Sequence, residues 1–398
     1  MNQEVSAFLK QEISDWKRNG TFRKKRSLHG PQGGLVNVDG KEVVMLSSNN
    51  YLGLASHPKI IEAAIQAIEK YGCGTASVTE VCGLTELHNE LQNRIAVFTG
   101  TESALLYSSC STANIGVIDC LMTDGDVIFS DQFNHASIID GCRITKAKTV
   151  VYPHNDMKAL EKALKENDGA RRKMIITDGV FSMEGDTAPL DIVVELGERF
   201  NAIKVVDESH AIGVVGRGGI GTGELYGVQD RIDIFTGTFG KALGGAGGGY
   251  LCGSRDMTDY LYHRSRPFIF TNALPPATVA VGIAALEILE NDSQCLETLW
   301  DNTRYFRNAL EKIGLKLLGG ESPIIPVLIG DTAKAYQMSN ELFDLGVFIT
   351  AIGYPVVSSD EARLRVQISA SLGKIDLDVA IHAIDQTAQK LGVGKYEK

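Results

Sequence analysis

Short apolar runs that alternate with helical patterns constrain the fold of this chain more than any other feature. Between residues 60 and 200 the runs have strand length, and between them apolar residues recur at helical spacing. The runs, with those that follow up to residue 252, are residues 104–107, 126–130, 149–152, 174–177, 204–206, 232–235 and 249–252. Alternating strands and helices predict an α/β fold with a mostly parallel sheet and right-handed crossovers.

The two ends of the chain differ from this central part. A helix is predicted over residues 3–19, and a hairpin over residues 35–46 turns at Asp39-Gly40, a pair typical of a type I′ turn. After about residue 275 the predicted order is helix 277–291, helix 295–313, strand 324–329, helix 333–345, strand 363–368 and helix 375–391. We therefore predict an N-terminal segment over 1–50, a large domain over 51–275 and a small α+β domain over 276–398.

Charge and composition exclude several classes of protein. Acidic residues outnumber basic ones by 49 to 39, which argues against a nucleic-acid binder. The seven cysteines form no CxxC pair, so we expect neither a metal site nor a disulfide framework. The N-terminus has no apolar signal core, and the apolar stretch 277–289 is too short to span a membrane. We expect a cytoplasmic protein that binds neither nucleic acid nor membrane.

An acidic residue and a histidine follow one of the predicted strands. Asp207 comes directly after the run 204–206, and His210 follows three residues later. Ligands of open parallel sheets bind beyond the carboxyl ends of the strands, where a carboxylate suits a cation on a ligand. A plain helix cap is an equally good interpretation of Asp207 taken alone.

A second candidate is a lysine among glycines. Fourteen of the 42 glycines fall between residues 216 and 253, and Lys241 lies among them. A lysine that few neighbours cover can reach a bound carbonyl group, and nearby cations or desolvation make its amine nucleophilic. An exposed loop lysine is the alternative interpretation. The surrounding sequence does not match a P-loop.

A third candidate is the hydroxyl-rich segment 108–114, which follows the run 104–107. Small residues at the start of a helix leave N–H groups available to an anion such as phosphate. A simple Ser/Thr helix cap is the commoner explanation. Residues 216–221 also match G-x-G-x-x-G, but no amphipathic helix follows them, so a glycine-rich surface loop is favoured over a dinucleotide site.

Together, an anion site, a strand-end carboxylate and an accessible lysine match one cofactor. Pyridoxal 5′-phosphate (PLP) carries a phosphate, a ring nitrogen that can be protonated and an aldehyde. Each feature is weak alone, but their combination, with Lys241 34 residues after Asp207, predicts a PLP enzyme.

The chain resembles the α-oxoamine synthases, PLP-dependent enzymes of fold type I, over essentially its whole length. The segments that carry the resemblance are 49–54, 134–137, 177–183, 207–210 and 238–241. Within the family the likeness is greatest to the glycine C-acetyltransferases (2-amino-3-ketobutyrate CoA ligases), in segments 108–110, 264–272 and 354–357. The resemblance implies a large PLP-binding domain and a small C-terminal domain.

The resemblance also implies roles for the matching residues around the PLP ring. Lys241 is the residue that bonds to the PLP aldehyde, and Asp207 pairs with the ring nitrogen. His135 stacks on the ring, while Ser182 and His210 form hydrogen bonds near its phenolic oxygen. Lys241, His210, His135 and Asp207 are the expected catalytic residues.

Further roles concern the phosphate and the subunit interface. Cys110 and Ser111, through their backbone N–H groups, and Thr238 are expected to bind the phosphate. Thr271 and Asn272 resemble residues that a partner subunit contributes, which implies a homodimer with shared active sites.

The expected substrates are glycine and acetyl-CoA, which condense reversibly to 2-amino-3-oxobutanoate and CoA; the reverse direction belongs to threonine breakdown. Asn49 and Arg365, beside His135, are expected to bind the substrate carboxylate. Thr79 stands where the family usually has arginine, and Ser111 stands where an aromatic residue is common. Both positions leave the acyl chain open.

Other functions remain as alternatives. One is a related synthase, similar to 8-amino-7-oxononanoate synthase or serine palmitoyltransferase, that uses a longer acyl-CoA or a different amino acid. A catalytically dead binding subunit is disfavoured by Lys241, and a nicotinamide dehydrogenase would have to use segment 216–221.

Overall fold

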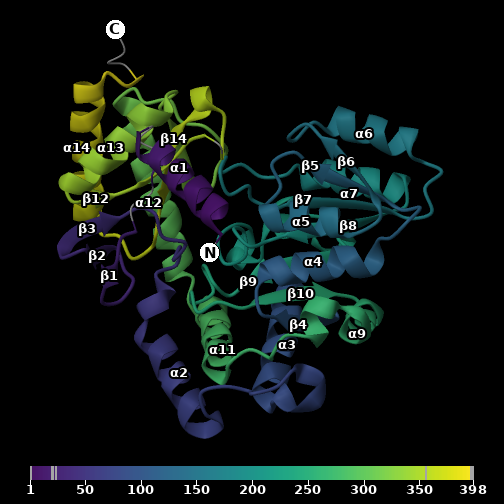
Figure 1. Ribbon diagram of the computed structural model, residues 1–398. Coiled ribbons are helices and arrows are strands. Elements are labelled where there is room, and N and C mark those ends of the chain that lie inside the picture. Colours follow the sequence, from purple (N-terminus) through teal and green to yellow (C-terminus); the bar gives the residue numbers. More distant parts are fainter. Residues whose placement is uncertain (1, 19–21, 23–24, 355, 395–398) are drawn as a thin grey trace. The chain divides into compact units, whose positions relative to one another are not determined.

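The structure is a computed structural model that describes residues 2–18, 22, 25–354 and 356–394. The chain divides into two compact units, which are described separately (Figure 1). The large unit comprises Asn49–Leu299 and Gly320–Ser322. The small unit comprises Met1–Ser48, Trp300–Gly319 and Pro323–Lys398.

A seven-stranded sheet forms the centre of the large unit, in the order β4-β10-β9-β8-β7-β5-β6. Its strands are β4 (Ser103–Tyr107), β5 (Val127–Asp131), β6 (Lys148–Tyr152), β7 (Lys173–Asp178), β8 (Ala202–Asp207), β9 (Ile234–Thr238) and β10 (Gly249–Gly253). Strands β5 to β9 pair in parallel, whereas β10 runs antiparallel to both of its neighbours. The predicted mostly parallel α/β sheet is therefore confirmed, and each strand overlaps a predicted run.

Both faces of this sheet are buried. Side chains alternate between the faces of a strand, so Ile128 and Met174 lie on one face while Phe129 and Ile175 lie on the other, and all four are fully buried. The first face packs against the apolar side of α4 (Cys110–Leu121). A parallel sheet needs this double cover, which explains why its strands are continuous apolar runs.

Besides α4, the α-helices of the large unit are α2 (Pro58–Tyr71), α3 (Glu86–Thr99), α5 (Ala136–Ile144), α6 (Met157–Glu166), α7 (Leu190–Arg199), α8 (Thr222–Leu225), α9 (Arg255–Arg264), α10 (Arg266–Ile269) and α11 (Pro276–Asn291). Helices α3, α4, α6, α7 and α9 pack against strands of the sheet, α4 lies beside α5, and α2 packs on α11 (Figure 1). Residues Thr79–Gly83 form a short π-helix.

In its described residues, the small unit contains two sheets, four α-helices and a short 3₁₀ helix over Ser359–Glu361. A four-stranded sheet comprises β1 (Leu28–His29), β2 (Leu35–Val38), β3 (Lys41–Met45) and β12 (Val347–Phe348), and a three-stranded sheet comprises β11 (Ile324–Leu328), β14 (Arg363–Gln367) and β13 (Thr350–Ile352). The helices are α1 (Gln3–Arg18), α12 (Gln294–Lys312), which begins in the large unit, α13 (Thr332–Asp344) and α14 (Lys374–Leu391). The predicted hairpin is present, with φ of 52° at Asp39 and 86° at Gly40. Asn19, the last residue of the helix predicted over 3–19, lies outside the described residues.

The division into units differs from the one that the sequence predicted. Helix α11 packs against α2 and α3 and so belongs to the large unit, not to the C-terminal domain. Strand β12 pairs in parallel with β3, which joins the N-terminal segment to the C-terminal part of the chain. Pairing between distant segments of sequence leaves no local signal. Among the helices in the described ranges, none has both the length and the apolar character needed to cross a membrane.

Candidate active site

A cavity of about 190 Å³ lies in the large unit, where the carboxyl ends of β7, β8 and β9 meet the first turns of α4 and α5. The residues that line it are Ser109, Cys110, Ser111, His135, Ser137, Asp178, Val180, Ser182, Asp207, Ser209, His210, Thr238 and Lys241. Every residue predicted to bind PLP within its own subunit is on this wall. The roles assigned to these residues stay predictions.

Asp207 ends β8 and is held by donors from three directions. Its carboxylate accepts hydrogen bonds from Asn114 Nδ2 at 2.7 Å and from the backbone N–H of Ser209 at 2.9 Å. Cys110 Sγ lies 3.5 Å from each carboxylate oxygen, and burial raises the pKa of this thiol well above its usual value, so it remains a neutral donor. These contacts fix the buried carboxylate in one orientation at the cavity wall.

The same asparagine reaches His135 through a serine. Asn114 Nδ2 donates to Ser137 Oγ at 3.0 Å, and Ser137 Oγ lies 2.8 Å from His135 Nδ1. The backbone N–H of Ser137 also donates to His135 Nδ1, so this nitrogen is the acceptor and the ring proton is on Nε2. Burial lowers the pKa of His135, Asp207 opposes this shift and Lys241 adds to it. His135 is therefore a neutral imidazole.

The start of α4 offers backbone donors to the cavity. Ser109 caps the helix by accepting a hydrogen bond from the backbone N–H of Thr112 at 3.1 Å. The N–H groups of Cys110 and Ser111 precede the intrahelical bonds and lie at the cavity wall. A Cβ atom on Gly249 of β10 would lie only 2.3 Å from Cys110 N, so glycine is required for the strand to approach. This end of α4 suits an anion.

Lys241 lies in the glycine-rich turn between β9 and β10. Thr238 braces this turn, because its hydroxyl donates to Gly248 O at 2.7 Å and accepts from the backbone N–H of Gly240 at 3.0 Å. Four glycines from 244 to 248 have positive φ, which only glycine adopts without strain. The glycine cluster in the sequence therefore builds the backbone that places Lys241 at the cavity.

Two further buried residues stand beside the predicted ones. Tyr51, which is fully buried, places its hydroxyl 2.8 Å from His210 Nδ1. Asp178 ends β7 and accepts a hydrogen bond from the backbone N–H of His135 at 3.0 Å; burial and then the charge of Asp207 raise its pKa well above the usual range. No role was predicted for Tyr51, Asp178, Asn114 or Ser137, although all but Asn114 lie in segments that carried the resemblance.

Four predicted residues do not line the cavity. Arg365 is on β14 of the small unit and donates to Gln367 Oε1 at 3.0 Å. Asn272 forms a β-bridge with Val78 in the large unit. Thr271 and Asn49 also belong to the large unit. Pro355 in segment 354–357 lies outside the described residues.

The G-x-G-x-x-G segment, 216–221, does not form a nucleotide site. It precedes α8, which has only four residues and whose first two residues hold the buried carboxylate of Glu208. The backbone N–H and the hydroxyl of Thr222 donate to Glu208 at 2.9 Å and 2.6 Å, and Gly223 N–H donates at 3.2 Å. Burial raises the pKa of Glu208 to about 7. The segment itself is partly exposed, with Arg217 and Gly218 exposed and Gly219 and Gly221 buried, which agrees with the predicted glycine-rich surface loop.

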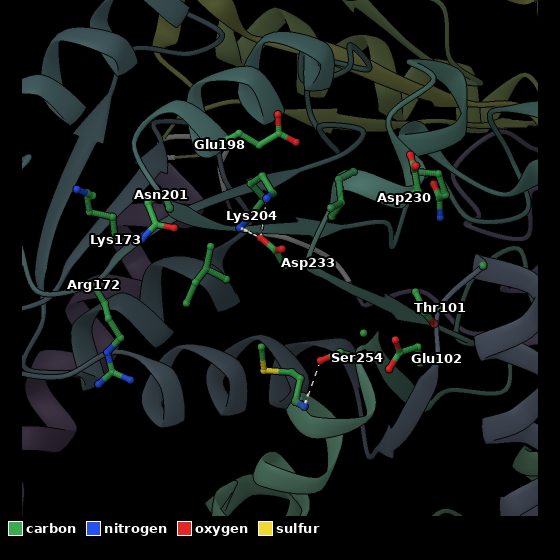
Figure 2. A pocket seen from close by; sticks show the side chains of 18 of the residues that line it. Thr101, Glu102, Arg172, Lys173, Glu198, Asn201, Lys204, Asp230, Asp233 and Ser254 are labelled. Carbon is green, nitrogen blue, oxygen red and sulfur yellow. Dashed lines mark hydrogen bonds and ion pairs between the residues drawn. The ribbon is translucent and has the colours of Figure 1, made fainter.

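A larger cavity, of about 800 Å³, lies at the opposite edge of the sheet, where β7, β8 and β9 begin (Figure 2). Charged residues of both signs line it and pair with each other or with neighbours. Lys204 Nζ, for example, is 3.0 Å from Asp233 Oδ2. Parallel sheets bind ligands at the carboxyl edge. The smaller cavity is therefore the candidate active site.

The smaller cavity fits PLP in the chemistry of its donors. The end of α4 supplies N–H groups for a phosphate, Asp207 supplies a fixed carboxylate for a ring nitrogen, and Lys241 supplies an amine for an aldehyde. Ser209 Oγ is buried at the wall without a hydrogen-bond partner among the described residues.

Comparisons with known proteins agree with this chemistry. The model of the aminotransferase class I and II family matches residues 41–384. The chain is 46% identical to the 8-amino-7-oxononanoate synthase of Thermoanaerobacter pseudethanolicus, over 97% of this chain and 98% of the relative. It is 44% identical to 8-amino-7-oxononanoate synthase 1 of Bacillus subtilis, over 96% of this chain and 98% of the relative. A solved structure of SPT with its PLP internal aldimine superposes with a TM-score of 0.94 at 29% identity, covering 98% of this chain and 100% of that one.

Proposed function

Because the chain belongs to the α-oxoamine synthases, PLP-dependent enzymes of the class I and II aminotransferase family, we propose that it is an 8-amino-7-oxononanoate synthase. The observation that carries this proposal is the 46% identity with such a synthase over 97% of the chain. The sequence resemblance favoured glycine and acetyl-CoA as substrates. The proposal replaces them with the substrates of the alternative stated there, a synthase similar to 8-amino-7-oxononanoate synthase. The expected place in threonine breakdown is withdrawn with glycine and acetyl-CoA.

The name of the product defines the substrates. In 8-amino-7-oxononanoate the amine on C8 is next to the ketone at C7. Carbons 8 and 9 are what alanine keeps after losing its carboxyl carbon, and carbons 1–7 are a seven-carbon dicarboxylic acyl group. The proposed reaction therefore forms a bond between the alanine Cα and the carbonyl carbon of an acyl thioester. The free thiol and CO₂ leave, and a proton returns to Cα.

PLP, when bound, supplies an aldehyde for the amino group and a ring that takes up electrons from Cα. Cys110 and Ser111 at the start of α4 would hold its phosphate, and Asp207 would keep its ring nitrogen protonated. Asn114 supports that role by fixing the carboxylate from behind, at 2.7 Å. These are properties of the chain itself and do not depend on the acyl group.

We assign to Lys241 the removal of the proton from the substrate Cα. Apart from two histidines, its amine is the basic side chain that lines the cavity. Neutral His135, with its proton on Nε2, lines the cavity and would pack against the bound ring. His210, held by Tyr51, would donate a hydrogen bond to the oxygen of the thioester as negative charge develops on it. Asn49 and Arg365 remain our candidates for the substrate carboxylate.

The decisive experiment measures two products across a matrix of substrates. Purified enzyme is given alanine, glycine or serine, each labelled at the carboxyl carbon, with heptanedioyl-, acetyl- or palmitoyl-CoA, and both thiol release and labelled CO₂ are followed. We expect the highest kcat/KM for alanine with heptanedioyl-CoA, with equal amounts of CO₂ and thiol.

The preferred pair of substrates separates the alternatives. If glycine with acetyl-CoA is fastest, the enzyme forms 2-amino-3-oxobutanoate and our proposal is wrong. A preference for serine with palmitoyl-CoA would assign a serine palmitoyltransferase activity. Lys241→Ala is the control for all nine combinations, because it removes the proposed base.

A further inference from the structure

Outside the cavity, three loops of the large unit meet at one histidine. His154 follows β6, and its two ring nitrogens face two different carboxylates: Nδ1 is 2.9 Å from Asp131 Oδ1, and Nε2 is 2.9 Å from Asp186 Oδ2. Asp131 ends β5, and Asp186 lies in the loop after β7. The histidine is thus the link between loops that leave three adjacent strands of the sheet.

This arrangement requires a protonated imidazole. A neutral ring has one nitrogen without a proton, and that nitrogen would face a carboxylate oxygen across 2.9 Å. Burial alone lowers the pKa of His154, but the hydrogen bonds and charges of Asp131 and Asp186 raise it to about 10. His154 is a cation between two anions, and the charge-assisted bonds on both sides are of the stronger kind.

The loop from β5 carries His135. Besides His154, the carboxylate of Asp131 accepts hydrogen bonds from the backbone N–H groups of Phe133 at 2.8 Å and Asn155 at 2.9 Å. The ring of Phe133 stacks on His154 with centroids 4.6 Å apart. Phe133 lies two residues before His135. This contact therefore fixes the backbone directly before His135, which lines the cavity.

The loop from β7 carries Ser182. Residues 180–187 fold back on themselves, with the N–H of Phe181 donating to Asp186 O at 2.9 Å and a β-bridge between Val180 and Thr187. The ring of Phe181 meets His154 edge-on, with centroids 4.4 Å apart. Asp186, which forms an ion pair with His154, and Phe181, whose ring contacts His154, are therefore hydrogen-bonded to each other beside Ser182.

We propose that His154 is a positioning residue for the PLP site: by bridging Asp131 and Asp186 it holds the two loops that place His135 and Ser182 at the cavity wall. The residue itself is not on that wall. The proposal requires only that PLP binds in the cavity, and it does not depend on which amino acid or thioester the enzyme uses.

The test is a PLP dissociation constant, measured by equilibrium dialysis of the purified full-length holoenzyme against graded PLP. We expect His154→Gln to raise this constant by about tenfold or more, as is usual when a residue that orients binding groups is lost. Asp186→Asn, which changes charge and hardly changes shape, should act in the same direction. We expect kcat to fall with either change, while KM for the thioester changes less.

A double mutant with Ser182→Ala distinguishes a positioning role of His154 from a merely structural one. If His154 acts through the loop of Ser182, the effect of His154→Gln on the PLP constant should be smaller in a Ser182→Ala background than in the wild type. The matched control is Asp126→Asn at the other end of β5, where Asp126 is buried and paired with Arg171 at 2.9 Å. It should lower the melting temperature and leave PLP binding unchanged.

Two outcomes would overturn the proposal. One is a His154→Gln protein that melts earlier but binds PLP like the wild type, as the Asp126→Asn control should. The other is full additivity with Ser182→Ala. If His154→Gln gives no folded protein, the PLP constant of Asp186→Asn decides. All of these results are independent of turnover, so they stand whether or not the enzyme proves to be an 8-amino-7-oxononanoate synthase.

Discussion

At the scale of single residues, Asn114 connects Asp207 with Ser137, the residue that contacts His135. One amide nitrogen donates to Asp207 and to Ser137, and the amide oxygen accepts from the hydroxyl of Thr236 at 2.7 Å. Removing this amide leaves several buried polar groups without a partner. Each such group costs about 1–3 kcal/mol.

We therefore predict that Asn114→Ala destabilises the protein and also weakens PLP binding, by roughly tenfold. Urea unfolding measures the first effect, and equilibrium dialysis of the holoenzyme measures the second. Asn167→Ala is the matched control, because the amide of Asn167 also donates and accepts, to Ala163 O and from Lys148 Nζ, but at the end of α6. Equal PLP binding by Asn114→Ala and wild type would show that Asp207 needs no support from Asn114.

At the scale of elements, the sequence predicts the strands of the large unit well because their apolar runs are short and end at polar residues. It also predicts the cavity residues that have a chemical signature, such as Lys241 among its glycines. Asn114 has no such signature, because an asparagine one turn into an apolar helix looks like any buried polar residue. The pairing of β12 with β3 and the packing of α11 are contacts between distant segments, which local patterns do not encode.

The joint between β10 and α4 is an element-scale feature that a mutation can test. Gly249 is the first residue of β10, and a Cβ atom there would lie 2.2 Å from the carbonyl carbon of Ser109. Because the neighbouring atoms are backbone, the first turn of α4 has to move. Gly249→Ala should cost about 1–3 kcal/mol of unfolding free energy and raise the PLP dissociation constant.

Gly169→Ala is the control for this prediction. Nothing lies within 4 Å of a Cβ atom at Gly169, and its φ is not positive. Its unfolding free energy should change by less than about 1 kcal/mol, and PLP binding should not change. If Gly249→Ala binds PLP normally, the first turn of α4 does not hold the phosphate as we propose.

At the scale of the whole molecule, one part of the large unit presents apolar surface next to Thr271 and Asn272. Segments 75–83 and 270–274 are joined by the Val78–Asn272 bridge, and each exposes a large apolar side chain, with Val81 75% and Phe270 70% exposed. Large apolar side chains exposed on two joined segments suit a surface that binds another protein. We propose that a second copy of the chain binds here and receives Thr271 and Asn272 in its active site.

Subunit mixing tests this shared site. Thr271→Asp places a carboxylate where we expect the partner's phosphate, and Lys241→Ala removes the proposed base. Each homodimer should be inactive. In a hybrid of the two, one site carries both changes and the other carries neither, so random exchange should restore roughly a quarter of the wild-type sites. Recovered turnover, with hybrids verified by native mass spectrometry, is the measurement.

The control for mixing uses two residues of the same wall. Asp207 and Lys241 line one cavity within one chain, so in a hybrid of Asp207→Asn and Lys241→Ala each site still carries one change. This pair should give no recovery under conditions in which the first pair recovers. If neither pair recovers although hybrids form, each chain builds its own site and Thr271 acts within it. Recovery by both pairs would mean that Asp207 and Lys241 serve different sites, which their common cavity forbids.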